Sequence, residues 1–112
     1  MVLVLSHAWT LDEGEHRDAY VRLTDEFEGF HRAQPGFRGR RLVRDRDDGR
    51  HFLNLRWWDA PEDYERMVAD PAYPGWIDRL SEHVEARDPQ KSTFVVVVDH
   101  DDPAIHPVTG PS

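Results

Sequence analysis

Residues His51–Asp59 read HFLNLRWWD, a stretch that suits a β-strand and decides how the segments around it are interpreted. Successive side chains of a strand point to opposite faces of its sheet. One set is purely apolar, as a core face requires: Leu53, Leu55 and Trp57. The other set mixes aromatic rings with an amide and a guanidinium group: Phe52, Asn54, Arg56 and Trp58. We expect the first set to pack under helices.

The segments before this strand predict a strand, a helix and a second strand. Residues 2–9 are apolar on both strand faces, which is typical of a central strand. A helix is predicted over residues 16–33, where apolar side chains recur at spacings of three and four: Tyr20, Leu23, Phe27 and Phe30. Gln-Pro-Gly at residues 34–36 ends it. Residues 37–46 predict a strand that the turn at 47–49 joins to the opening stretch as a hairpin.

The segments after it predict a second helix and a final strand. Asp59 suits the N-cap, Pro61 fits the first turn, and Glu62 follows the cap by three residues. The helix is interrupted at residues 70–75 and resumes with one apolar stripe: Trp76, Ile77, Leu80 and Val84. Residues 91–99 contain STFVVVV and predict a strand. Three prolines and a glycine predict an irregular C-terminal tail over residues 100–112.

The resulting order, β-α-β-β-α-β, predicts an α+β ferredoxin-like domain over residues 1–99, with two helices on one face of a four-stranded antiparallel sheet. A second copy of the chain is the simplest cover for the other face, because symmetric dimers are the commonest oligomers. We therefore predict a homodimer. In this arrangement the strand face that carries Asn54 would line a cavity between the sheet and the partner.

Composition excludes several classes of function. A chain of 112 residues suits one domain, and its net charge of -8 argues against nucleic acid and anionic membranes as partners. The absence of cysteine excludes disulfides and thiol chemistry. The first residues form too short an apolar run for a signal peptide or membrane span, which predicts a cytoplasmic protein. Acidic and histidine side chains between Asp99 and His106 lack regular ligand spacing, so we predict no metal.

Three segments together resemble the antibiotic biosynthesis monooxygenase (ABM) family of the dimeric α/β-barrel group. They are PGFRGRRLVRD at 35–45, FLNLRWWDAPEDY at 52–64 and DPAYPGWIDRL at 70–80. The resemblance implies a cofactor-free monooxygenase, similar to enzymes that oxidise polyketide phenols to quinones with O₂. Those enzymes use an Asn and a Trp four residues apart and a Tyr six residues further on, and Asn54, Trp58 and Tyr64 match these spacings. The family's cavity arginine falls at Asp78, next to Arg79.

Further candidates come from position in the predicted fold. His7 ends the first strand, and a histidine near a cavity mouth titrates in the range that suits a general base, although a surface histidine fits as well. We expect the substrate, a flat phenolic or anthrone-like aromatic, to contact Phe52, Arg56, Trp76 and Arg79. A catalyst of this kind needs a proton acceptor, donors for a developing oxyanion and a dry pocket.

Three other functions stay open at this point. The haem-degrading members of the same superfamily carry a ligating histidine late in the second helix, near Trp76 and Ile77, whereas the nearest histidine here is His83. A non-catalytic, small-molecule-binding dimer needs none of the reactive groups. Isomerase or decarboxylase chemistry would use a related cavity.

Overall fold

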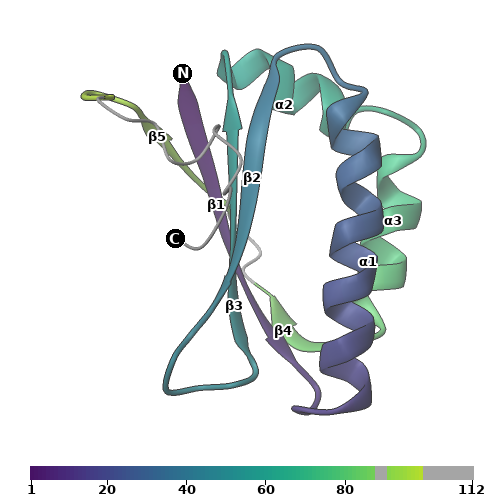
Figure 1. The fold of residues 1–112 in the computed structure, drawn as a ribbon. Helices are drawn as coiled ribbons and strands as arrows, with labels where there is room; N and C mark the ends of the chain where they lie inside the picture. The colour runs from purple at the N-terminus through teal and green to yellow at the C-terminus, as the bar shows by residue number, and fades with distance from the viewer. Residues whose placement is uncertain (88–90, 100–112) are drawn as a thin grey trace, which may run out of the picture.

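The computed structural model describes residues 1–87 and 91–99, so the predicted tail at 100–112 lies outside the described part of the chain. Figure 1 shows a sheet with helices along one side. The elements in chain order are β1 (Val2–Thr10), α1 (Glu15–Arg32), β2 (Phe37–Arg44), β3 (His51–Trp58), α2 (Pro61–Val68), α3 (Tyr73–Ser81), β4 (Val84–Arg87) and β5 (Ser92–Val95). The fold is α+β and ferredoxin-like, as the sequence predicts.

The antiparallel sheet has the order β2-β3-β1-β4, and β5 also pairs with β1, which is therefore central as predicted. β4 pairs with Ala8–Thr10 and β5 with Val2–Leu5, so they share one edge of β1. The prediction of a final strand over residues 91–99 is too long, because the strand there covers only Ser92–Val95. β5 ends at Val95 because its partner position is Val2, at the very start of β1. Val84 belongs to β4 and not to a helical stripe.

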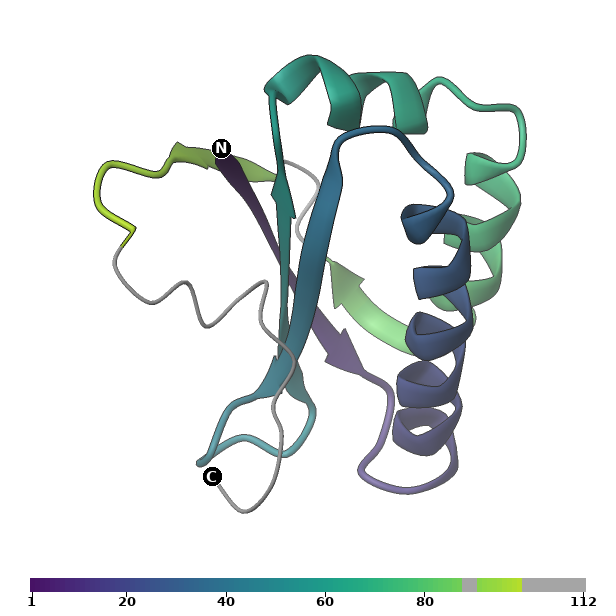
Figure 2. The same cartoon turned by 45° about the horizontal axis from the view of Figure 1, so that its top comes forward.

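The helices all lie on one side of the sheet, and the other face carries none of them (Figures 1 and 2). The predicted second helix is two shorter ones, α2 and α3, separated by the turn that contains Asp70 and Pro71. Of the helices in the described ranges, none is both long and apolar enough to cross a membrane.

The two faces of β3 are the reverse of those expected. Burial alternates along the strand, and the side chains under the helices are Phe52, Asn54, Arg56 and Trp58, all at most 5% exposed. Phe52 packs with Tyr20 and Leu23, which the sequence assigned to the other face. Leu53, Leu55 and Trp57 are half-buried on the open face. Both sets hold large apolar groups, so hydrophobicity alone did not distinguish the core face from an apolar outer face.

A tight turn joins the first helix to β2 and abuts the start of α2. Gly36 has φ 84°, in the left-handed region that glycine adopts without strain, and a Cβ there would lie 2.2 Å from the Asp63 carboxylate. That carboxylate accepts the Ala60 backbone N–H at 3.1 Å, and Ala60 is the N-cap of α2. The predicted cap at Asp59 is therefore wrong by one residue, although Pro61 does occupy the first turn.

Candidate functional site

A small, partly enclosed cavity lies between the sheet and the helical layer. Its volume is about 40 Å³. The lining side chains come from four strands or strand ends and two helices: Ser6, Ala8, Tyr20, Phe27, Asn54, Arg56, Ile77, Leu80, Val84 and Lys91. Two of them are cations and none is a carboxylate, in a chain whose net charge is -8. The described lining therefore favours an anionic or strongly hydrogen-bonding guest.

Asn54 lies at the floor of this cavity, where hydrogen bonds join it to two neighbouring polar side chains. Its Nδ2 donates to the Tyr20 hydroxyl at 2.8 Å, and its Oδ1 accepts from Arg56 Nη2 at 3.5 Å. Asn54 pairs across the sheet with Ser6 of β1, another buried polar residue. A mid-strand asparagine is disfavoured by propensity. Here its amide is buried beneath the helices and hydrogen-bonded at both ends.

Arg56 is a buried cation with few compensating contacts. It is 5% exposed, its Cζ lies 5.7 Å from the centre of the Phe27 ring, and its Nε has no hydrogen-bond partner. No carboxylate of the described residues forms an ion pair with it. Burial lowers the pKa of Arg56, whereas Tyr20 and Tyr73 act in the opposite direction. A buried charge without a counter-charge is unfavourable unless a ligand supplies one.

A lysine and two tyrosines lie beside Arg56. Lys91 Nζ donates to the Tyr73 hydroxyl at 2.6 Å and lies 5.5 Å and 5.3 Å from the ring centres of Tyr64 and Tyr73. Burial, followed by the negative charge of Tyr73, raises the pKa of Tyr64 well above its usual value. Tyr64 is therefore a neutral hydroxyl near pH 7, so it is suited to donate a hydrogen bond and not to accept a proton.

Trp58 lies deeper than the cavity and is not among its lining residues. It is fully buried, its Nε1 has no hydrogen-bond partner, and its ring centre is 6.1 Å from that of Tyr64. His31 of α1 lies 6.2 Å from the Trp58 ring and donates from Nδ1 to the Phe27 carbonyl at 2.9 Å. Burial, followed by the charge of Arg56, lowers the pKa of His31 to about 3, so the imidazole is neutral near pH 7. Its Nε2 is therefore a hydrogen-bond acceptor, and it has no partner.

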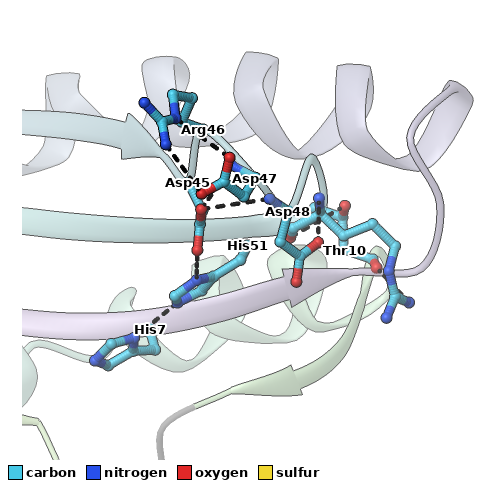
Figure 3. A network of polar contacts seen from close by, with 8 residues as sticks. His7, Thr10, Asp45, Arg46, Asp47, Asp48 and His51 are labelled. Carbon is cyan, nitrogen blue, oxygen red and sulfur yellow. Dashed lines mark hydrogen bonds and ion pairs between the residues drawn. The ribbon is translucent and has the colours of Figure 1, made fainter.

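His7, a candidate base that the sequence did not place in or out of the cavity, lies on the open face of the sheet and does not line the described cavity. Its partner is His51, with Nδ1 of His7 2.9 Å from Nε2 of His51. His51 in turn contacts the Asp45 carboxylate at 3.1 Å, and Figure 3 shows the three side chains in sequence along the sheet. The reason is the strand alternation: Leu53, the cross-strand partner of His7, also lies on the open face.

The remaining candidates lie around the cavity and not in it. Phe52 packs against Tyr20 with ring centres 5.3 Å apart. Trp76 stacks on Phe27 at 5.1 Å, behind the cavity wall. Arg79 lies at the surface, where it covers the Trp76 ring at 5.0 Å and bonds to Glu26 at 3.3 Å. Arg79 thus lies outside the cavity, whereas Arg56 lines it.

Four residues of the site escaped sequence reasoning: Tyr20, His31, Tyr73 and Lys91. His31 had a readable signal, because it follows Phe27 by four residues and so continues the buried helical stripe. Tyr20 was assigned to the core and not to a polar contact. Lys91 precedes the last strand by one residue, and nothing in the local pattern distinguishes it from a solvated lysine.

Two larger depressions are open surface grooves of mixed charge. One, of about 670 Å³, runs between α1 and β2, and the other, of about 860 Å³, lies between the start of α1 and the end of α3. Each holds acidic and basic side chains together, so neither has the one-sided charge of the partly enclosed cavity. No group of three or more histidine, aspartate or glutamate side chains in the described part of the chain is placed to hold a metal ion.

Comparison with known proteins gives one family and a set of similar folds. A family model described as antibiotic biosynthesis monooxygenase matches residues 9–79. SnoaB, a cofactor-independent oxygenase from Streptomyces nogalater, has a similar structure, with a TM-score of 0.76 and 17% identity over 90% of this chain and 97% of that one. Rv0793 from Mycobacterium tuberculosis gives a TM-score of 0.68 and 17% identity over 90% and 98%. No curated protein matches the sequence.

Proposed function

The chain belongs to the antibiotic biosynthesis monooxygenase family, and from this premise we propose that it oxidises a flat phenolic or anthrone-like aromatic with O₂ and no cofactor. The observation that carries the proposal is the cavity lined by Arg56 and Lys91 without a described carboxylate. An aromatic that ionises to a phenolate or enolate supplies the missing negative charge. The same anion is electron-rich enough to reduce O₂ directly.

The proposed roles follow from the contacts of each side chain. Arg56 and Asn54 hold the substrate oxygen as it becomes anionic, because a guanidinium and an amide donate to it from the cavity floor. Trp58 adds an indole N–H once its surroundings rearrange, and Tyr64 adds a neutral hydroxyl. Loss of a proton, addition of O₂ and loss of water convert an anthrone CH₂ group to a carbonyl, with the second oxygen atom leaving as water.

Substrate binding in this proposal requires the cavity to open. Pockets that hold drug-sized ligands measure roughly 300–1,000 Å³, whereas this cavity of about 40 Å³ suits one or two water-sized molecules. Phe27 and Ile77 form its helical wall, so α1 and α3 have to separate from the sheet. Trp76 stacks on Phe27 and should report this movement through its fluorescence.

The proposal includes a homodimer formed through the open face of the sheet. This face presents a large apolar surface: Leu3, Leu5, Leu53, Leu55 and Trp57, all half-buried, with Val43 at 39% exposure beside them. A second copy of the chain would cover it. Light scattering of wild-type protein should give a dimer, and Leu55→Asp should give a monomer, with Leu11→Asp, at an exposed loop position, as the control. A monomeric wild type at micromolar concentration would contradict this part of the proposal.

The reaction is tested by oxygen uptake with a panel of hydroxylated anthrones and metal-stripped protein. Wild-type protein should exceed the uncatalysed rate, and Asn54→Ala should lower turnover by about 10²–10³-fold if its amide acts in the transition state. The control is Asn54→Ser, which keeps a small polar group on the same face. Uptake at the background rate across the panel would overturn the proposal. Ligand binding without uptake would then favour a binding module, and a Soret band on addition of haem would favour the haem alternative.

A further inference from the structure

The side chains described above as candidate bases do not suit the role of proton acceptor in the cavity. His7 lies on the far side of the sheet, and Tyr64 keeps its proton well above neutral pH. His31 is a weak base, because burial and the charge of Arg56 lower its pKa to about 3. An oxidation that begins with loss of a proton from the substrate still requires a group that accepts it.

We propose that Tyr73, held by Lys91, is this proton acceptor, and that Tyr64 serves as a neutral donor beside it. The inference deepens the proposed function and rests on it. Tyr73 begins α3 and packs against both apolar clusters of the core. It lies outside the cavity lining, so the substrate would reach it when the cavity opens. Lys91 lines the cavity and places its ammonium 2.6 Å from the Tyr73 oxygen.

The surroundings of Tyr73 stabilise its phenolate form. A charge-assisted hydrogen bond from an ammonium to a phenolate is stronger than one to a neutral hydroxyl. The Tyr64 hydroxyl bonds to Tyr73 as a second donor, and the negative charge of Tyr73 contributes to the raised pKa of Tyr64. The positive charge of Arg56 lies close enough to interact with both.

The proton balance closes over one turnover. The Tyr73 phenolate takes a proton from the substrate, so an O–H bond forms at Tyr73 as the C–H or O–H bond of the substrate breaks. The substrate anion, facing Arg56, adds O₂ and becomes a peroxide anion. Tyr73 returns its proton to that anion, and the hydroperoxide then loses water to leave a carbonyl. The lysine–tyrosine pair is thereby restored, and O₂ is the only oxidant.

The chain holds three tyrosines, so their ionisation can be followed directly by the ultraviolet absorbance of tyrosinate during a pH titration. In wild-type protein one tyrosine should ionise at clearly lower pH than the other two. Tyr73→Phe should remove this first step, Lys91→Met should move it to higher pH, and Lys91→Arg should largely retain it. Tyr64→Phe is the matched control, because it removes a hydroxyl from the same cluster yet should leave a separate first step in place. Persistence of that step in Tyr73→Phe, or its absence from the wild type, would overturn the inference.

The kinetic test separates this inference from the proposed function. With an accepted substrate, Tyr73→Phe should lower kcat by about 10²–10⁴-fold and abolish the acid limb of its pH profile, whereas Tyr64→Phe should keep that limb. If the wild type turns over and Tyr73→Phe keeps both its rate and its acid limb, the inference fails while the proposed function stands. If no substrate is oxidised but the first ionisation depends on Tyr73 and Lys91, the proposed reaction fails and the assignment of the ionising pair is supported.

Discussion

Replacing Arg56 by methionine removes the buried cation while keeping a long, flexible side chain of similar reach. The wild-type guanidinium is 5% exposed, has no described carboxylate partner and leaves Nε without an acceptor. Replacing buried ion pairs by apolar groups is neutral or stabilising by about 1–4 kcal/mol in known cases, and an unpaired charge has no ion-pair attraction to lose. The substitution also removes two favourable contacts of Arg56, one with the Phe27 ring at 5.7 Å and a long hydrogen bond to Asn54 at 3.5 Å. These contribute roughly 0.5–2 and 0.5–1.5 kcal/mol respectively.

The gain and the losses nearly cancel, so Arg56→Met should leave the free energy of unfolding within about 2 kcal/mol of the wild-type value. Turnover of a phenolic substrate should nevertheless fall by about 10²–10³-fold, because the anion loses its charged donor. Urea denaturation and oxygen uptake measure the two effects on the same protein. A large loss of turnover without a large loss of stability would be the signature of a charge kept for ligand binding.

Arg38→Met is the matched control, because Arg38 is an exposed arginine whose contact is an ion pair with Asp59 at 3.2 Å. It should change the free energy of unfolding by less than about 1 kcal/mol and leave turnover unchanged. A loss of more than about 2 kcal/mol in Arg56→Met would refute the reasoning. It would mean that the guanidinium is a satisfied structural group and that the cavity does not select for an anion.

Three further predictions test the fold and its response to pH. Phe52→Ala should lower the free energy of unfolding by about 3–5 kcal/mol, whereas Leu53→Ala in the monomeric state should have a smaller effect; equal effects in urea denaturation would mean that the helix-facing side has been misassigned. His31 binds a proton in the unfolded chain near pH 6.5 but in the folded chain only near pH 3, so stability should fall as pH drops from 6.5 towards 3. Wild-type protein should lose about 2–3 kcal/mol more than His31→Leu between pH 7 and 4.5, and parallel losses would contradict the buried neutral state. Asp63→Ala should lower the free energy of unfolding by about 1 kcal/mol, because the hydrogen bond to the N-cap of α2 is lost. A larger loss in Asp59→Ala would instead support Asp59 as the cap, as the sequence predicted.

The order of strands and helices was available from the sequence, because it rests on local signals. Period-two and period-four spacing identified the strand at residues 51–58 and the stripe of α1, and Pro35-Gly36 marked the end of the helix. The split of the final strand was not available, since it depends on where β1 begins and how far its edge extends. The motif spacing correctly indicated that Asn54 and Trp58 share one face, which strand alternation guarantees.

Which face that is was decided only by the tertiary structure. Both faces of β3 carry large apolar groups, and the sequence does not show which one the helices cover and which one they leave open. The same limit applies to chemistry. Tyr20, Arg56, Tyr73 and Lys91 lie up to 71 positions apart in the sequence, and each is an ordinary residue in its own segment. Their shared environment, a cavity with two cations and three nearby tyrosines, exists only because the helices pack over the sheet, since burial and mutual charge depend on distance in space and not along the chain.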